Sequence, residues 1–128
     1  MPKSSKANDQ LAFDIAFYEQ LLREKPNFVD ALVALGEAYT RRGLYEKGFA
    51  VDQQLTQLKT NDPVVWYNCA CSLSLLQRLD ESLEALQRAM ALGYDDFEFL
   101  ATDPDLRALR QSPQFRRFLE TRSSSASP

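Results

Sequence analysis

Few side chains in this chain could carry out chemistry. Histidine is absent, which removes the commonest general base and the commonest metal ligand. The two cysteines, Cys69 and Cys71, are too few for a four-thiolate zinc site within one chain. The four glycines are scattered, so the sequence holds no phosphate-binding loop. We therefore expect a protein that is not an enzyme and that carries no cofactor and no metal.

The remaining reactive groups have simple structural explanations. On a helix, Cys69 and Cys71 would point in directions about 200° apart, so they cannot form a disulfide with each other. Cys69 falls on an apolar stripe, where a buried cysteine behaves as a small hydrophobic residue. A reactive thiol is the alternative for this pair. Carboxylate pairs such as Glu81 and Glu84 are typical of charged helix surfaces, so we do not interpret them as catalytic.

The overall charge and the hydropathy limit the classes of partner and the location. A net charge of -3 and a pI near 5.0 do not favour phosphate neutralisation, so nucleic acid is not expected. No apolar run approaches the roughly 20 residues of a membrane-spanning helix. The N-terminal stretch 1–10 is basic and polar, unlike a secretory signal. Together with the sparse cysteines, these features predict a cytoplasmic location.

The elements that would position any site are helices. Apolar residues recur at helical spacing, and no stretch alternates apolar and polar residues over strand length. Prolines and glycines separate the segments. Short helices are also expected after Asp96, Asp103 and Ser112, each of which suits a helix N-cap. The polar stretches 1–8 and 123–128 predict disordered tails. The five longer helices are expected at 10–25, 28–42, 45–59, 63–76 and 80–92.

The sequence repeats itself with a period of 34 residues. A shift by this period aligns Leu32 with Trp66, so a large side chain is aligned with a large one. The same shift places Gly36 on Ala70 and Gly48 on Ser82, so small falls on small. Small residues at these positions would let the two helices of a pair approach closely, while large residues fill the space between neighbouring pairs. Since one pair cannot bury its apolar face alone, such units must stack.

This pattern resembles the tetratricopeptide repeat, or TPR, in its bacterial form with a helical C-terminal cap. Asp52 replaces the aromatic residue usual in the family, and Gln77 replaces the usual turn glycine. The resemblance implies an all-α, right-handed superhelix, or α-solenoid, of about two and a half helix pairs. It divides residues 9–122 into a half repeat, two repeats and a cap, at 9–26, 28–62, 63–95 and 96–122. The matching residues are Leu32, Leu35, Gly36, Tyr39, Tyr45 and Gly48 in the first full repeat, and Trp66, Cys69, Ala70, Leu73, Leu79, Ser82, Leu86 and Ala89 in the second.

In this family the first helix of each pair lines a concave face that binds peptides. Tyr67 is the expected anchor, because an exposed tyrosine makes a good hot spot. Glu37 would select against acidic ligands. The alternative is that the chain's own tail or first helix covers this surface. Carried over to this chain, the expected binding residues are Val33, Glu37, Arg41, Val64, Tyr67, Asn68 and Cys71.

Charge is unevenly distributed near the C-terminal end. Residues 80–105 carry eight acids against Arg88, and residues 106–122 carry five arginines against Glu120. The simpler interpretation is that these arginines pair with the acidic stretch before them. The alternative is a patch for an acidic partner or, less readily, for RNA.

The function expected from these features is non-catalytic protein–protein interaction, as an adaptor, scaffold or co-chaperone-like module. Two alternatives stay open. One is a chaperone for bacterial secretion substrates, which would form dimers. The other is self-assembly into a homo-oligomer through the first helix, where Phe13, Phe17 and Leu21 offer an apolar face.

Overall fold

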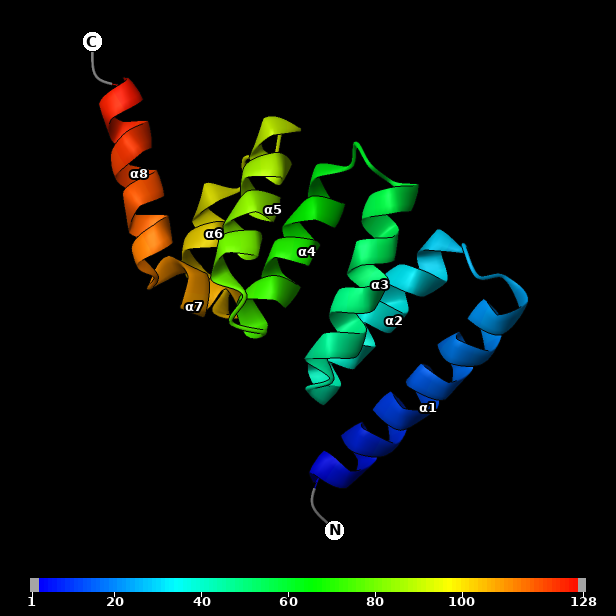
Figure 1. Ribbon diagram of the computed structural model, residues 1–128. Coiled ribbons are helices and arrows are strands. Elements are labelled where there is room, and N and C mark those ends of the chain that lie inside the picture. Colours follow the sequence, from blue (N-terminus) through cyan, green and yellow to red (C-terminus); the bar gives the residue numbers. More distant parts are fainter. Residues whose placement is uncertain (1–2, 127–128) are drawn as a thin grey trace. The chain divides into compact units, whose positions relative to one another are not determined.

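The computed structural model describes the backbone of residues 3–126 and the side chains of residues 6–122. Over this range the protein is all-α, without a strand, as the periodicity predicted (Figure 1). The elements are α1 (Lys3–Glu24), α2 (Val29–Arg42), α3 (Tyr45–Leu58), α4 (Pro63–Leu75), α5 (Leu79–Ala91), α6 (Phe97–Thr102), the 3-10 helix η1 (Pro104–Leu106), α7 (Arg107–Arg110) and α8 (Pro113–Ala126).

The bounds of α2 to α5 agree with the expected helices to within one residue. The two end helices are longer than the sequence suggested. Helix α1 begins at Lys3, although a disordered tail was expected through residue 8, and α8 continues to Ala126. Polar residues alone do not end a helix. The added residues of α1 and α8 contain no proline or glycine, the residue types that disfavour a helix. The expected tails also include residues 1–2 and 127–128, which lie outside the described residues.

None of the described helices is both long and apolar enough to cross a membrane.

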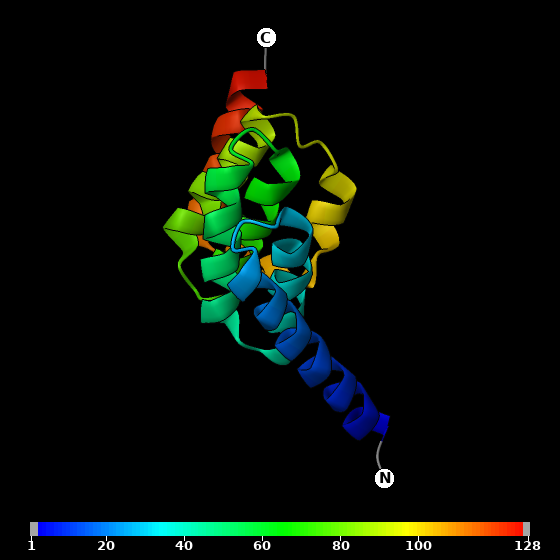
Figure 2. The ribbon, with the colours of Figure 1, turned by 90° about the vertical axis from the view of Figure 1, so that its right-hand side faces the viewer.

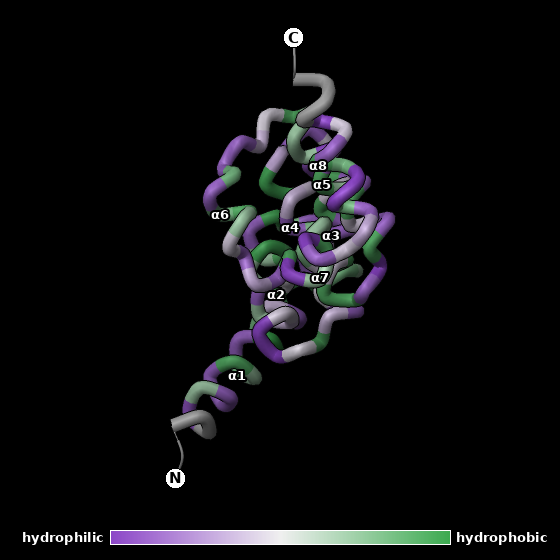
Figure 3. The backbone as a smooth tube through the Cα atoms, turned by 90° about the vertical axis from the view of Figure 1, so that its left-hand side faces the viewer, coloured by the Kyte–Doolittle hydropathy of each residue, from purple (hydrophilic) through white to green (hydrophobic). Residues whose placement is uncertain are grey.

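The chain divides into two compact units, the first ending at Thr60 and the second beginning at Asn61. Unit 1 contains α1, α2 and α3, and its core includes Leu32, Leu35 and Leu55. Helix α2 contacts both α1 and α3. Hydrophobic and hydrophilic residues both occur along α1 (Figure 3), so this helix can bury only part of its surface.

The α2–α3 hairpin of unit 1 and the α4–α5 hairpin of unit 2 have small residues at the same register. In the α2–α3 hairpin, an added Cβ at Gly48 would lie 3.1 Å from Thr40 Oγ1 and 3.7 Å from the Gly36 carbonyl oxygen. In the α4–α5 hairpin the corresponding residues are Ser82 and Ala70, both fully buried. The Ser82 hydroxyl donates to the Ala70 carbonyl oxygen at 2.7 Å. The helices of each pair therefore approach closely at positions 34 residues apart.

The first helix of each hairpin also ends in the same way. Helix α2 is followed by Gly43 in the left-handed region, with φ of 81°, and Leu44 N–H donates to the Tyr39 carbonyl at 2.9 Å. Helix α4 is followed by Gln77 at φ of 62°, and Arg78 N–H donates to the Leu73 carbonyl at 2.9 Å. Gln77 thus forms the same turn as Gly43, since a non-glycine residue can adopt this conformation at a modest cost.

Beyond α5, unit 2 continues into a cap formed by α6, η1, α7 and α8. An extended stretch leads from α5 to α6, which is yellow in Figure 2. The three expected N-caps are all present. Asp96 accepts from the Phe99 amide at 3.1 Å, Asp103 from the Asp105 amide at 3.0 Å, and Ser112 from the Phe115 amide at 3.1 Å. These bonds fix where each short helix begins and hence where the cap turns back onto α4.

Candidate functional site

The expected binding residues of unit 1 lie on one side of α2, which we call the α2 face (Val33, Glu37 and Arg41). Their spacing of four places them in a row along the helix. Val33 is half-buried, whereas Glu37 and Arg41 are exposed. The α2 face therefore presents a carboxylate and a guanidinium to solvent within unit 1, beside a partly covered apolar residue.

The expected residues of unit 2 lie on the α4 face (Val64, Tyr67, Asn68 and Cys71), and here one expectation is wrong. Tyr67 is not an exposed anchor, because only 3% of its surface is accessible, and Cys71 is also buried. The reason is that η1 and α7 of the cap contact α4. The chain thus covers this part of unit 2 itself, but with the cap and not with the tail or first helix that the alternative named.

A buried polar cluster holds the cap on α4. The Tyr67 hydroxyl donates to Asp103 Oδ2 at 2.7 Å, and the Cys71 thiol lies 3.7 Å from the same oxygen. The Tyr67 ring stacks on Tyr94, with centroids 4.2 Å apart and planes 7° from parallel. Asp103 is itself buried, and its other oxygen caps η1. One carboxylate therefore organises the start of η1 and satisfies two donors from α4.

The cluster favours neutral side chains on α4. Burial raises the pKa of the Tyr67 hydroxyl, and the hydrogen bond to Asp103 raises it further. Burial, followed by the charge of Asp103, raises the pKa of the Cys71 thiol. Since thiolate is the nucleophilic form, Cys71 is poorly suited to redox or covalent chemistry. Burial also raises the pKa of Asp105, and the nearby charge of Asp103 adds to this effect.

The other two residues of the α4 face are less covered. Val64 is 54% exposed, and Asn68 is half-buried. Val64 lies in the first turn of α4, where its amide donates to the capping carboxylate of Asp62 at 2.9 Å. The cap thus covers Tyr67 and Cys71 but leaves the beginning of α4 accessible.

Sequence reasoning did not identify Asp103 or Tyr94 as partners of Tyr67. Asp103 was interpreted only as a helix cap, a role that it does have. A tyrosine on the first helix of the second hairpin, followed by a short capping segment that contains an aspartate, is a signal that could have suggested a hydrogen bond between them. The distance of 36 residues along the chain conceals the pairing.

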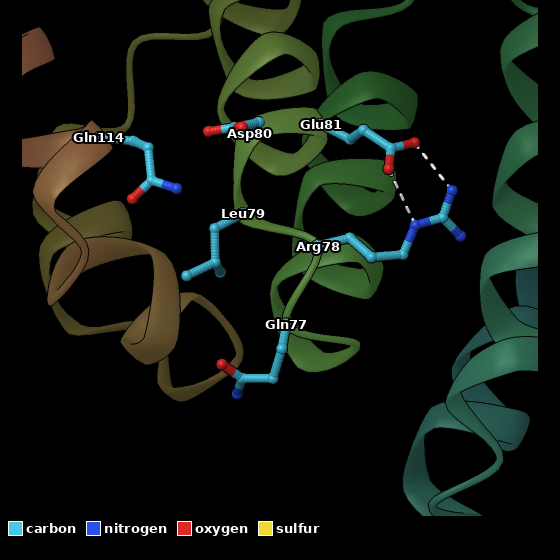
Figure 4. A pocket seen from close by; sticks show the side chains of 6 residues that line it. All are labelled: Gln77, Arg78, Leu79, Asp80, Glu81 and Gln114. Carbon is cyan, nitrogen blue, oxygen red and sulfur yellow. Dashed lines mark hydrogen bonds and ion pairs between the residues drawn. The ribbon is translucent and has the colours of Figure 1, made fainter.

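Two pockets of unit 2 differ in character. Figure 4 shows a polar hollow of about 310 Å³ between the start of α5 and Gln114 of α8. Two of its three charged residues engage each other, because Arg78 forms a two-pronged ion pair with Glu81, with Nη2–Oε2 at 2.8 Å. Arg78 and Glu81 therefore satisfy each other instead of facing a ligand.

The second pocket is larger and mostly apolar, with a volume of about 570 Å³. It is formed within unit 2 by α5, α6, α7 and α8, and two arginines lie in its lining, Arg110 and Arg122. The expected pairing of the cap's arginines with the acidic stretch is wrong within the described side chains. Arg110 donates instead to the carbonyls of Leu100 and Asp103, at 2.9 and 2.6 Å. Arg122 lies over the Phe118 ring, 5.5 Å from its centroid.

Within the side chains that the structure describes, no group of histidine, cysteine or carboxylate residues is arranged to hold a metal ion.

Comparison with known proteins gives one partial similarity. The chain is 33% identical over 88 residues to a chloroplastic protein of Arabidopsis thaliana. The similar region covers 66% of this chain and 26% of that protein, so the chain spans about a quarter of the relative's length. No protein-family model matches the chain.

Proposed function

We propose that this chain is a tetratricopeptide-type module that binds a partner protein without catalysing a reaction. The equivalence of the two hairpins supports this proposal best. Gly36 and Gly48 in one hairpin, and Ala70 and Ser82 in the other, occupy the same close approach 34 residues apart. Stacked helix pairs of this kind present extended surfaces to partners. The absence of histidine from the sequence supports the non-catalytic part.

The α2 face is the proposed binding surface. Glu37 and Arg41 are exposed there and carry opposite charges, which suits a partner segment that bears both signs. In unit 2, taken by itself, Val64 and Asn68 at the start of α4 remain candidates, whereas Tyr67 and Cys71 do not because the cap covers them. The cytoplasmic location stays a prediction.

Site-specific photo-crosslinking in the native cell tests the α2 face. A photoreactive amino acid at position 37 should form adducts with a partner protein. The same group at position 53 is a matched control, since Gln53 is also exposed but lies on α3. Arg41→Glu should weaken the adduct formed at position 37, because it reverses one of the two charges.

Adducts that form equally at positions 37 and 53 would contradict the proposed surface, and so would the absence of adducts at 37. Tyr67→Phe provides a second control. It removes a buried hydroxyl and should leave the crosslinks at position 37 unchanged, whereas an exposed Tyr67 anchor would make this variant defective.

Self-assembly is a second candidate function, and α1 supplies a specific observation for it. Phe13 is 65% exposed and Phe17 is 53% exposed, and their rings stack with centroids 6.5 Å apart. Leu21, the third residue of the expected face, is half-buried. An exposed aromatic pair one helical turn apart is suited to a second copy of the chain.

Light scattering separates self-assembly from a monomeric binding module. If α1 mediates assembly, the wild type should exceed the monomer mass, and Phe17→Glu should return it to that of one chain. Leu44→Glu introduces the same charge at an exposed apolar residue of unit 1 outside α1 and should leave the mass unchanged. A monomeric wild type would count against both self-assembly and the secretion-chaperone alternative, which also requires a dimer.

A further inference from the structure

The apolar pocket of unit 2 is too large and too exposed to be a packing defect. Its volume of about 570 Å³ lies within the range of 300–1,000 Å³ that is usual for ligand pockets. Two of its apolar residues remain largely in solvent, Phe97 at 52% and Leu119 at 48% exposure. Met90 of α5 and Phe118 of α8 complete the apolar surface used in this argument. Covering this surface with a bulky apolar group removes it from water and so favours binding.

The charged side chains that line the same pocket are all positive. Arg110 and Arg122 belong to its lining, and the lining contains no carboxylate. Arg110 is held in place by two backbone carbonyls, which leave its positive charge without a carboxylate partner among the described residues. Arg122 likewise forms no ion pair with a described carboxylate; its guanidinium stacks on Phe118. An apolar pocket with two such guanidinium groups complements an acidic ligand that carries an apolar side chain.

We infer that this pocket, called here the α8 pocket, binds an acidic segment of a partner protein. One bulky apolar side chain of the segment enters between α6 and α8, and neighbouring carboxylates approach Arg122 and Arg110. The α8 pocket belongs wholly to unit 2, whereas the α2 face belongs to unit 1. This inference therefore goes beyond the proposed function and does not depend on it.

Selection from a display library of short random peptides, with the whole chain as bait, tests the inference. Selected peptides should share a bulky apolar residue flanked by aspartate or glutamate. Leu119→Glu should weaken their binding by at least about tenfold, because it places a carboxylate where the apolar anchor enters. Arg122→Glu should weaken binding by about tenfold at low salt and by less at high salt.

Arg117→Glu is the matched control. It makes the same charge change on the same helix, but Arg117 is exposed and does not line the pocket. Its effect should be clearly smaller than that of Arg122→Glu. Since Leu119 and Arg122 are both exposed, the variants should keep the wild-type circular dichroism and melting curve.

Four results would overturn the inference. The first is a failure to select any peptide, or selection of peptides without acidic residues. The second is equal loss of binding for Arg117→Glu and Arg122→Glu, which would show only an effect of overall charge. The third is binding that resists Leu119→Glu but is lost in Arg41→Glu, which would assign the peptides to the α2 face and leave the proposed function standing. Binding to phosphatidylserine vesicles with the same dependence on Leu119 and Arg122 would replace the peptide by a lipid surface and would also overturn it.

Discussion

The α2 face and the α4 face occupy the same register of two equivalent hairpins, yet their exposure is opposite. The middle of the α2 face is charged and in solvent, whereas the middle of the α4 face is buried beneath the cap. The helices end in the same type of turn, so backbone geometry does not account for the difference. The residues that differ at equivalent positions are Val33 and Tyr67, Glu37 and Cys71, and Arg41 and Leu75.

The cap covers the α4 face within unit 2, and the side chains of that face suit this burial. Tyr67 and Cys71 supply apolar surface and two donors for one buried carboxylate, Asp103. At the equivalent place Glu37 would bring a second carboxylate, and burying two like charges together is costly. The side chains of the α4 face therefore suit a cover that contains Asp103, and those of the α2 face suit solvent.

The most disruptive test gives the α4 face the character of the α2 face. Cys71→Glu places a carboxylate beside Asp103 under the cap. We expect a loss of about 3–5 kcal/mol in the free energy of unfolding, because the new charge is buried without a partner. Urea denaturation measures this loss. Limited trypsin digestion after Arg107 and Arg110 should accelerate, since η1 and α7 would detach from α4.

The reverse change on α2 sharpens the same comparison. Glu37→Cys alters an exposed residue, so the free energy of unfolding should change by no more than about 0.5 kcal/mol. Similar losses in Cys71→Glu and Glu37→Cys would show that the two faces do not differ in the way that the structure describes.

The second largest effect is expected at the carboxylate that joins the cap to α4. Asp103→Ala removes the N-cap of η1 and leaves the buried Tyr67 hydroxyl without its acceptor, for a combined loss of about 2–4 kcal/mol. Asp62→Ala is the control, because Asp62 caps α4 through the Val64 amide at a more exposed site. Its loss should be about 1 kcal/mol. If chemical denaturation gave the same loss of unfolding free energy for Asp103→Ala and Asp62→Ala, the contact between Asp103 and Tyr67 would add no stability beyond capping.

Alkaline pH should lower the free energy of unfolding of both units, because each contains a buried tyrosine. Burial and the hydrogen bond to Glu19 raise the pKa of Tyr39 from 10.0 to about 12. Burial and Asp103 raise the pKa of Tyr67 above 10.0 as well. Above pH 10 each tyrosine keeps its hydroxyl proton in the folded state but loses it in the unfolded state. The contribution of each tyrosine to the free energy of unfolding is therefore complete below pH 10 and declines above it. For Cys71, whose pKa is also raised, the decline begins at its ordinary value of 9.0.

The decline should not exceed about 1.4 kcal/mol per pH unit for each tyrosine. Urea denaturation in steps between pH 8 and about pH 11 measures it. Tyr39→Phe and Tyr67→Phe should each flatten the curve above pH 10, one through unit 1 and the other through unit 2. A curve with the same slope in the wild type and in both variants would contradict the assignment.

The sequence predicted most of the secondary structure because its signals are local. Gly43 and Pro63 end and begin helices by their own backbone preferences, and Asp96 and Ser112 cap the helices that follow them. The start of α1 at Lys3 was missed, because the sequence argument treated polarity as a sign of disorder.

The candidate site was predicted less well because it depends on distant contacts. The 34-residue period assigned Val33 and Tyr67 to equivalent positions, but it contains no information on what covers each of them. That depends on Asp103, 36 residues beyond Tyr67. The α8 pocket was missed for the same reason, since Phe97 and Leu119 come together only when the cap is folded.

The smallest expected effect concerns the turn that the two hairpins share. Gly43 adopts φ of 81° without strain, whereas Gln77 adopts φ of 62° with a Cβ that disfavours this region. Gln77→Gly should therefore stabilise unit 2 by about 0.5–1 kcal/mol, less the entropy that a new glycine adds to the unfolded chain. Calorimetry would register a rise in Tm.

Gly43→Gln is the reciprocal change and should lower stability by a similar amount. An added Cβ at Gly43 would meet no atom within 4 Å, so φ and not crowding would account for the loss. If Gln77→Gly is instead neutral or destabilising while Gly43→Gln is destabilising, the two turns are not equivalent in energy. The glutamine would then contribute an interaction that offsets its strain, and the 34-residue equivalence would hold for backbone geometry alone.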